Sequence, residues 1–564
     1  MKLSNKKSVQ QIVLTLSALG LREVVISPGS RNAPLIISFN RHPEINCTVI
    51  RDERSAAFFA LGKALELNEP VAIVCTSGSA VLNYAPAIVE AYYLRVPLIV
   101  ITADRPEIWI GQGDGQTIDQ KNIYSNYIRK NYLLDGDTED ENILLNQVRS
   151  LAEGYFIATE KDRGPVHFNV FFNEPLFGLA EAPPFQIPQF PELKNERNIS
   201  DNEIEKLQNS FANSKKVMVL VGQMATDKML NDLLIQLSQF NNTIVLSEST
   251  ANIHHPNFIE NIDRCIMPMK EEELKDFFPD ILITFGGAIV SKKIKAVLRK
   301  YKPNQHWNVH PYDAKMNTYQ SLTHPIALDT VTFLERFLPK LKVETESDYK
   351  SKWIQWSSLL EEKHNQYVHG VAYSDFWVFS EILKKVPTNT NLHLGNSSPI
   401  RYAQLFDNRL IKNTHCNRGT SGIDGCTSTA MGAASAKPDQ PYLLITGDVS
   451  FFYDSNAFWN DHTPENLKII VINNSGGGIF RIIKGPSEVD ELETYFETKH
   501  NRSAKKLVDF NGWNYLSANS KETLQVALVD FLDKDSKKTV LEIFTPRELN
   551  PTCLAEYFKY LEIN

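Results

Sequence analysis

Short apolar runs that end in small or polar residues recur along the whole chain, with helical patterns between them. The first third contains three of these runs, REVVISPGS, VAIVCTSGS and VPLIVITADRP. Six more lie at 215–223, 242–249, 280–287, 442–450, 467–478 and 539–546. Continuous apolar runs joined by crossover helices are typical of parallel strands that are buried on both faces. The pattern therefore predicts an α/β fold built on doubly wound parallel sheets.

Two stretches without a clear period divide this pattern into thirds. Residues 174–193 are rich in proline, as an interdomain linker would be, and a charged run lies near 340–355. These boundaries predict three domains of the usual size, at 1–180, 195–342 and 350–564. Ligands of doubly wound domains bind beyond the carboxyl ends of the strands, so we expect the functional residues there.

Composition and charge narrow the classes of partner. The 564 residues are 42% hydrophobic and carry a net charge of −8, which disfavours nucleic acid or an anionic membrane as the main partner. No run approaches 18 apolar residues, and Val9, Ile12 and Leu16 lie on the stripe of an amphipathic helix rather than in a signal peptide. Six scattered cysteines without a C-x-x-C pair fit a reducing cytosol. We expect a cytoplasmic protein whose anionic ligands are held by local lysines and arginines.

The strongest chemical signal lies in TGDVSFFYDSNAFWNDHTPENLKIIVINNSGGGIF (446–480). One predicted strand ends at Asp448 and the next ends at Asn474, so both polar residues emerge at the same edge of a parallel sheet. A carboxylate and an amide carbonyl are oxygen ligands suited to Mg²⁺. The glycines after Asn474 allow the backbone to approach a metal-bound diphosphate closely. This spacing favours a metal-diphosphate site over two ordinary strand-end turns.

The stretch resembles the metal-diphosphate motif of the thiamine-diphosphate-dependent enzymes, in which Gly-Asp is followed by Asn-Asn. The resemblance implies thiamine diphosphate as the cofactor. It also implies that Asp448, Asn474 and the carbonyl of Gly476 hold Mg²⁺, or Mn²⁺ in its place. Further cofactor-binding residues that it implies are Ser77, Gly78, Gly447, Ser450, Gly477 and Ile479. By the same resemblance, 1–180 is the pyrimidine-binding domain and 350–564 the diphosphate-binding domain.

Thiamine chemistry requires two more groups. A carboxylic acid must hydrogen-bond to the aminopyrimidine ring so that its imino tautomer forms, and in the family this acid is a glutamate of the first domain. Glu53 in IRDERSAAFFALGKAL matches it, although an acid in a first helical turn also compensates a helix dipole. A bulky aliphatic residue must bend the cofactor, and Ile423 in NRGTSGIDG matches that position. The cofactor carries the difficult chemistry, so we expect Glu53 to be the one catalytic side chain.

The motifs SPGSRNAPL, TSGSAV, TADRP, GPVHFNVFFNEPL, NRGTSGIDG and NNSGGGIF follow the order of one subfamily, which acts in menaquinone biosynthesis. Its enzymes decarboxylate 2-oxoglutarate on thiamine and add the resulting carbanion to isochorismate. Two dicarboxylate substrates require converging cations, and arginine suits a bidentate grip. The resemblance implies that isochorismate is held by Arg31, Arg105, Gln116 and Lys292. It places Ser397, Arg401 and Arg418 on the succinyl side, and Ser30 and Phe480 complete the substrate-binding set.

The resemblance further implies a homodimer or homotetramer, because in this family the pyrimidine domain of one subunit meets the diphosphate domain of another. Two alternatives stay open at this stage. One is another thiamine-dependent 2-oxoacid decarboxylase or carboligase, such as an acetolactate-synthase-like enzyme, which has no need of Arg31 and Arg105. The other is a catalytically silent binding protein on the same scaffold, against which Glu53, Asp448 and Asn474 together argue.

Overall fold

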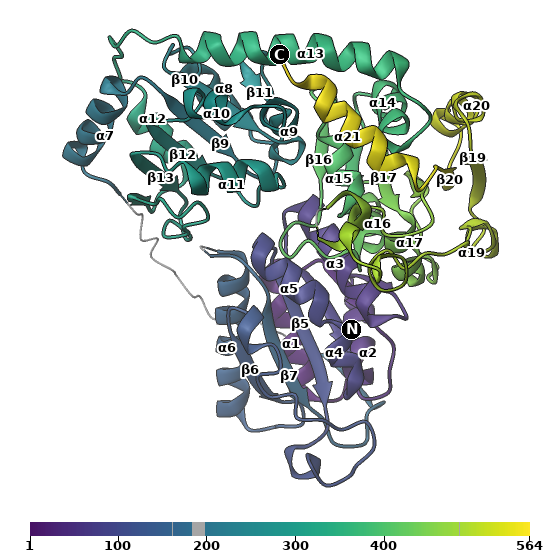
Figure 1. Ribbon diagram of the computed structural model, residues 1–564. Helices are drawn as coiled ribbons and strands as arrows, with labels where there is room; N and C mark the ends of the chain where they lie inside the picture. The colour runs from purple at the N-terminus through teal and green to yellow at the C-terminus, as the bar shows by residue number, and fades with distance from the viewer. Residues whose placement is uncertain (161, 183–197, 484, 564) are drawn as a thin grey trace.

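All nine apolar runs form parallel strands, most of them buried throughout, in the computed structural model, which describes residues 1–160, 162–182, 198–483 and 485–563. The strands fall into three six-stranded sheets, one in each domain (Figure 1). In chain order the nine are β2 (Glu23–Ile26), β4 (Val71–Cys75), β5 (Leu98–Asp104), β9 (Val217–Val221), β10 (Thr243–Ser247), β12 (Ile281–Phe285), β17 (Tyr442–Gly447), β18 (Leu467–Asn473) and β20 (Thr539–Phe544). The predicted fold class is confirmed.

The amino-terminal sheet has the strand order β3-β2-β4-β5-β7-β6, and all its pairs are parallel. Its other strands are β3 (Asn46–Val49), β6 (Asn131–Asp135) and β7 (Val166–Phe171), and its main helices are α1 (Lys7–Ala18), α2 (Ala33–Arg41), α3 (Glu53–Leu67), α5 (Ala85–Leu94) and α6 (Glu141–Thr159). The predicted amphipathic helix is α1, whose apolar stripe is buried. A short antiparallel pair, β1 (Lys2–Ser4) with β8 (Leu179–Glu181), ties the start of the chain to the end of this domain.

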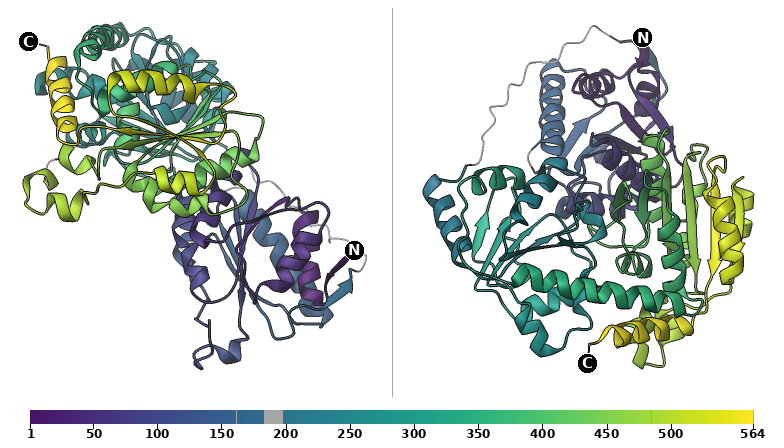
Figure 2. Two further views of the ribbon diagram at one scale, coloured as in Figure 1. Left: turned by 90° about the vertical axis from the view of Figure 1, so that its right-hand side faces the viewer. Right: turned by 90° about the horizontal axis from the view of Figure 1, so that it is seen from above.

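The central sheet runs β11-β10-β9-β12-β13-β14, again entirely parallel. This is the doubly wound order in which the chain moves outward from one central strand, first to one edge and then to the other. Its remaining strands are β11 (Phe258–Ile259), β13 (Gln305–Val309) and β14 (His324–Ile326), and its helices include α7 (Asp201–Asn213), α8 (Lys228–Leu237), α11 (Lys292–Lys300) and α12 (Thr330–Phe337). The long helix α13 (Tyr349–Gly370) then leads to the last domain (Figure 2).

The carboxy-terminal sheet, β16-β15-β17-β18-β20-β19, repeats the relative order of the first sheet. Its other strands are β15 (Asn391–Leu394), β16 (Asn413–His415) and β19 (Asn514–Ala518), and its helices include α14 (Asp375–Lys385), α15 (Ser398–Ala403), α16 (Cys426–Ala436), α17 (Asp448–Tyr453), α20 (Lys521–Leu532) and α21 (Leu549–Leu561). No helix in the described part of the chain is both long and apolar enough to cross a membrane.

Helices α3 and α16 pack the amino-terminal domain against the carboxy-terminal domain, and their buried residues belong to one hydrophobic core (Figure 1). The backbones approach closely, because a Cβ atom on Gly62 would lie only 1.9 Å from the carbonyl oxygen of Thr429. Of the proline-rich linker predicted at 174–193, residues 183–193 lie outside the described residues, as does the predicted start of the central domain at 195.

Candidate functional site

Seven of the twenty predicted site residues lie along the carboxyl edge of the amino-terminal sheet. Ser30 and Arg31 follow β2, Ser77 and Gly78 follow β4, and Arg105 follows β5, which are three neighbouring strands. The strand order reverses between β2 and β4. Doubly wound sheets bind their ligands at such a reversal.

Arg31 is 5% exposed, so the lone cation of the first motif is not a solvated surface residue. Its Nη1 donates to the carbonyl of Phe172 at 2.9 Å, and its Nη2 lies 3.2 Å from a carboxylate oxygen of Glu174. The buried Nε has no hydrogen-bond partner. Burial of an arginine with one free donor leaves it able to bind a further acceptor.

The loop after β5 folds back over this edge. Arg105 donates from Nη2 to the carbonyl of Gly115 at 3.1 Å, and the backbone N–H of Gly78 donates to Gln120 Oε1 at 3.0 Å. Gln116 is exposed, with φ of 55°, and its carbonyl oxygen lies 3.1 Å from the position of a Cβ built on Gly78. The structure therefore brings Arg105 and Gln116 to the same strand ends as Ser77 and Gly78.

Glu53 is the first residue of α3, at the carboxyl side of β3. Asp52 caps the helix by accepting from the N–H of Ser55 at 2.8 Å, so Glu53 is not needed as the cap. Glu53 lies close enough to Cys75 and Tyr84 that its charge adds to burial, the larger cause, in raising the pKa of both groups well above their ordinary values. The carboxyl group therefore lies near the end of β4.

A larger group of predicted site residues lies at the carboxyl edge of the last sheet. Ser397 follows β15, Arg418 follows β16, Gly447 and Asp448 end β17 and start α17, and the glycine turn follows β18. Because β16, β15, β17 and β18 are adjacent, all these residues share one sheet edge.

Asp448 and the Gly476 backbone form one corner. The Asp448 side chain is 2% exposed, accepting from the N–H of Val449 at 2.7 Å and of Gly476 at 2.9 Å. His500 Nε2 lies 3.3 Å from its Oδ2 atom. Burial is the main cause that raises the pKa of Asp448, and His500 and the two N–H groups oppose it. Gly476 has φ of 149°, and a Cβ there would lie 2.7 Å from the carbonyl of Glu497, so only glycine fits.

Asn474 follows β18 at the same sheet edge and has a side-chain oxygen without a hydrogen-bond partner. Its Nδ2 donates to Asp375 Oδ2 at 2.9 Å, whereas its buried Oδ1 has no hydrogen-bond partner. Asp375 is itself buried and accepts from the hydroxyl of Thr545 at 2.6 Å. Burial raises the pKa of Asp375 to about 6, against the hydrogen bonds that it accepts. The unpartnered buried carbonyl of Asn474 and the buried carboxylate of Asp448 are oxygen donors of the kind that a divalent cation binds.

Residues predicted to contact the cofactor rings and phosphates surround the corner. Ser450 donates from its hydroxyl to the carbonyl of Ile423 at 2.8 Å, which joins the start of α17 to the glycine-rich turn. Gly447 faces open space where a side chain would be, and the buried Ile479 with half-buried Phe480 follows the glycine turn. The N–H of Gly477 donates to Glu497 at 2.6 Å, which fixes the course of that turn.

The arginines of the last domain face acidic groups of the central domain. Arg418 is 9% exposed and donates from Nη1 to Asn396 Oδ1 at 2.9 Å, while its Nε is buried without a partner. Arg401 donates to the carbonyl of Ser397, which has φ of 73°. Burial lowers the pKa of Arg401, and the neighbouring Arg418 lowers it further.

Two carboxylates of the central domain meet at the start of α11. Glu248 accepts from the N–H of Val290 at 2.6 Å and of Ser291 at 2.7 Å, and Asp263 accepts from the Ser291 hydroxyl. Lys292, exposed at the first position of α11, is thus placed by both acids. Burial raises the pKa of Glu248 to about 7, whereas Arg418 acts to lower it.

The structure adds several groups that sequence patterns do not identify as site residues. Asp375 lies 99 positions before Asn474 in the chain. Glu248 and Asp263 lie in the central domain, where Lys292 is the one predicted site residue. A Ser-Asp helix start at 374–375 was the one local signal for Asp375. The remaining contacts join residues far apart in the chain, which periodicity cannot reveal.

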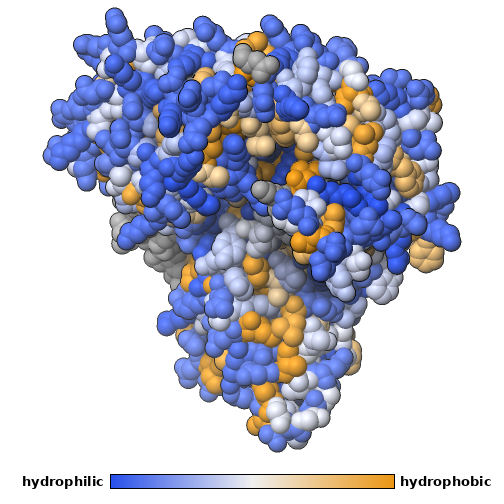
Figure 3. Space-filling view, in the orientation of Figure 1, coloured by the Kyte–Doolittle hydropathy of each residue, from blue (hydrophilic) through white to orange (hydrophobic). Residues whose placement is uncertain are grey.

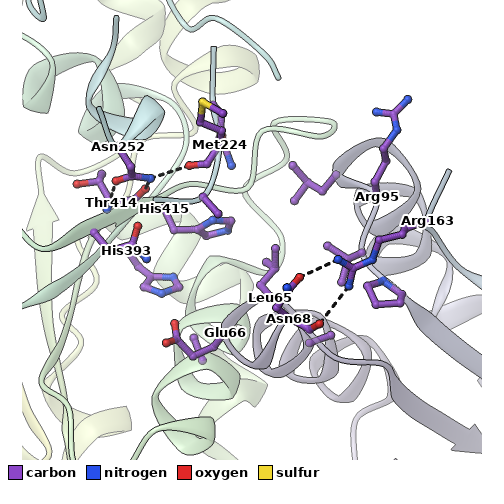
Figure 4. Close-up of a pocket in the computed structure, with 18 residues that line it drawn as sticks. Leu65, Glu66, Asn68, Arg95, Arg163, Met224, Asn252, His393, Thr414 and His415 are labelled. Atoms are coloured by element: carbon purple, nitrogen blue, oxygen red, sulfur yellow. Dashed lines mark hydrogen bonds between the residues drawn. The ribbon is translucent and has the colours of Figure 1, made fainter. Parts of the chain in front are cut away.

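A separate cavity of about 250 Å³ lies where the three domains meet. Figure 4 shows Asn68 and Arg163 of the amino-terminal domain on one side, and Asn252, His393 and His415 on the other. None of the predicted site residues lines it. The strand-end site and this cavity are therefore distinct.

Family models of thiamine pyrophosphate enzymes match along the chain: the N-terminal TPP binding domain at residues 6–123, the middle domain at 191–394 and the C-terminal TPP binding domain at 397–543. With the two polar sheet edges, these matches define a thiamine pyrophosphate enzyme. Three similar proteins are all named 2-succinyl-5-enolpyruvyl-6-hydroxy-3-cyclohexene-1-carboxylate synthase. They come from Christiangramia forsetii (45% identical, 100% of both chains), Flavobacterium psychrophilum (44%, 98% of both) and Flavobacterium johnsoniae (42%, 98% of both). The chain belongs to the family of these synthases.

The predicted family, the thiamine-dependent enzyme class and the cofactor thiamine diphosphate are thereby confirmed. The alternative of a catalytically silent binding protein is not supported, because the chain matches enzymes over nearly its full length. Small molecules are its substrates, as the names of the relatives imply.

Proposed function

We propose that this enzyme decarboxylates 2-oxoglutarate and joins the remaining succinyl unit to isochorismate, as a step of menaquinone biosynthesis. The product would be the carboxylate for which the relatives are named. The observation that carries the proposal is a set of cations at strand ends of all three domains in a chain of net charge −8. Two dicarboxylic acids need such cations, whereas a carboligase acting on monocarboxylates does not.

We propose Mg²⁺ at the corner formed by Asp448, Asn474 and the Gly476 carbonyl, with Mn²⁺ as an alternative ion. The unpartnered Asn474 Oδ1 and the buried Asp448 carboxylate support this, because both are oxygen donors that such ions prefer. The Gly476 carbonyl accepts from the N–H of Gly478 at 2.9 Å and retains a second lone pair.

Thiamine diphosphate, when bound, would supply a nucleophilic carbon and a cationic ring that delocalises the electron pair left behind when carbon dioxide departs. Glu53 would hold and return a proton at the pyrimidine ring, and Ile423 would support the bent cofactor. The cofactor would also lie against further residues at strand ends of both outer domains. These are Ser77, Gly78, Gly447, Ser450, Gly477 and Ile479.

The two substrates are assigned to opposite sets of cations. Isochorismate would be held by the first-domain edge and by the start of α11, and 2-oxoglutarate by the arginines of the last domain. The unpartnered Nε atoms of Arg31 and Arg418 support this division, since each buried guanidinium retains a free donor for a carboxylate. The full sets are Arg31, Arg105, Gln116 and Lys292 for the first, and Ser397, Arg401 and Arg418 for the second. Ser30 and Phe480 complete the substrate-binding residues.

We propose a homodimer or homotetramer whose active sites lie between subunits. Large apolar side chains remain exposed beside both halves of the site, among them Leu82, Ile108 and Trp109 in the first domain and Trp459 in the last. Figure 3 shows hydrophobic residues gathered on the amino-terminal domain, in the lower part of that view. A second copy of the chain would cover such surface. The six cysteines, all free, support a cytoplasmic location.

The deciding experiment measures carbon dioxide release from 2-oxoglutarate with thiamine diphosphate and Mg²⁺, with and without isochorismate. We expect release that depends on the cofactor, accelerates with isochorismate and accompanies formation of the named product. Turnover of pyruvate with equal efficiency would instead favour an acetolactate-type carboligase. Absence of any thiamine-dependent turnover would contradict the proposal.

A further inference from the structure

Glu90 is a buried carboxylate of the first domain that binds the last domain. It lies on α5 and is 1% exposed. Its Oε1 accepts from the N–H of Gly419 at 2.7 Å, and its Oε2 accepts from both the N–H and the hydroxyl of Thr420 at 2.6 Å. A Cβ on Gly419 would lie 2.7 Å from the Glu90 carbonyl oxygen, so the two backbones are in contact as well.

The segment that Glu90 binds is the 417–425 loop, which connects β16 to α16. It carries Arg418 at one end and Ile423 near the other. Asn396 bridges two parts of the loop, because its Nδ2 donates to the carbonyls of Asn417 at 2.6 Å and Gly422 at 2.7 Å. Within the described residues, the side-chain hydrogen bonds to Gly419 and Thr420, at the centre of the loop, come from Glu90.

We infer that Glu90 is a positioning residue, which holds the 417–425 loop so that Arg418 and Ile423 face the substrate and the cofactor. Two successive backbone N–H groups form an anion-binding turn, and here the anion is a side chain from another domain. A charged acceptor binds such donors more strongly than a neutral one. This inference rests on the proposed function, since it takes the roles of both loop residues from there.

The test compares Glu90→Gln with wild type. Glutamine keeps the shape of the side chain, but its NH₂ group would point donors at a backbone N–H donor of Gly419 or Thr420. We expect the dissociation constant of thiamine diphosphate with Mg²⁺, measured by protein fluorescence without substrate, to rise about 10-fold, as the loss of a charge-assisted hydrogen bond predicts. The KM for 2-oxoglutarate should rise by a similar factor. The KM for isochorismate should stay within about twofold, because the loop carries none of its assigned residues.

Thr420→Ala removes one of the three bonds and should shift the same two quantities by a smaller factor, even if Glu90→Gln fails to fold. In the double variant the effects should not add, since both changes act on one contact. Glu260→Gln, at an acid whose side chain is 10% exposed and pairs with His254 in the central domain, is the matched control and should behave as wild type.

Wild-type cofactor affinity and wild-type KM for 2-oxoglutarate in a folded Glu90→Gln enzyme would overturn the inference. Equal rises of both substrate KM values would assign Glu90 a general structural role and also overturn it. Failure of the proposed function is seen separately, because the wild-type enzyme itself would then release no carbon dioxide from 2-oxoglutarate.

Discussion

At the scale of single residues, Asn474 shows how a neighbour decides what an amide does. Its side chain can turn either end toward the corner where we propose a metal ion. The Asp375 carboxylate accepts a hydrogen bond from the N–H end at 2.9 Å, which leaves the carbonyl end without a hydrogen-bond partner. Such partners of metal ligands fix the orientation in which a ligand is useful.

Substitution of Asp375 tests this directly. We expect Asp375→Ala to weaken Mg²⁺-dependent binding of thiamine diphosphate about 10- to 100-fold, the range seen when the partner of a metal ligand is removed. Asp375→Asn should lose much less, since its carbonyl still accepts from Asn474 while its amide donates to Thr545. Fluorescence titration with Mg²⁺ at fixed cofactor measures both. An alanine variant that binds as wild type would show that Asn474 needs no support.

At the scale of elements, the crossing of α3 and α16 depends on small residues. The backbone of Gly62 meets that of Thr429, and the backbone of Gly432 meets Phe59. Glu53 is the first residue of α3, and Ile423 lies shortly before the start of α16. The close approach of the two helices therefore determines where both residues lie. Small residues permit this spacing, and larger ones would force the domains apart.

Gly62→Ala should therefore destabilise the protein although alanine favours helix by about 1 kcal/mol. A Cβ 1.9 Å from a backbone oxygen has no room, and we expect a net loss of about 2 kcal/mol or more in the free energy of unfolding. Gly370→Ala, at the end of α13 with nothing within 4 Å, is the control and should be neutral or slightly stabilising. Urea unfolding of both variants and of wild type measures these free energies of unfolding. Equal stabilities would mean that the helices move apart freely.

The start of α11 is a second feature at the scale of elements. Glu248 accepts hydrogen bonds from its backbone and lies near Asp263, Arg418 and Lys295. Burial raises the folded-state pKa of Glu248 from 4.5 to about 7. The folded protein thus binds this proton more tightly than the unfolded chain, and stability must fall as the pH rises between these values.

Relative to Glu248→Gln, wild type should accordingly lose stability from about pH 4.5 to pH 7 and no further above it. One pKa unit corresponds to about 1.4 kcal/mol, so the change is at most about 3 kcal/mol. Urea midpoints of the two proteins at pH 5, 6, 7 and 8 measure it. A difference that stays constant with pH would contradict a raised pKa at Glu248.

At the scale of the whole molecule, the two halves of the site lie on different sheets, one at each end of the chain. A site shared between copies can be tested by mixing two inactive variants, Glu53→Gln and Asp448→Asn. If subunits share sites, each hybrid dimer has one site with both wild-type residues. Random association makes half of the dimers hybrid, so about a quarter of wild-type activity should return.

The mirror experiment is the control. Hybrids of wild type with the double variant should be inactive if sites are shared, because each site then carries one substitution. If every site belongs to one chain, these hybrids keep one intact site, and the first mixture stays inactive. Affinity tags on the two partners isolate the hybrids before the assay.

The residues that follow apolar runs were recognisable from the sequence, because a strand buried on both faces must be apolar and must end in a polar turn. This determined the nine strands, the α/β class and the positions of Asp448, Asn474, Arg31 and Arg105. Spacing along the chain was sufficient, since neighbouring parallel strands end at one edge.

Only the tertiary structure decided which distant groups meet. The contacts of Glu90 with Thr420, of Asp375 with Asn474 and of Glu248 with the start of α11 join segments that are far apart in sequence or belong to different domains. They arise where sheets and helices pack, and no local pattern records that packing. Burial in those contacts, rather than residue type, also determines the pKa values and the free donors on which the proposed chemistry depends.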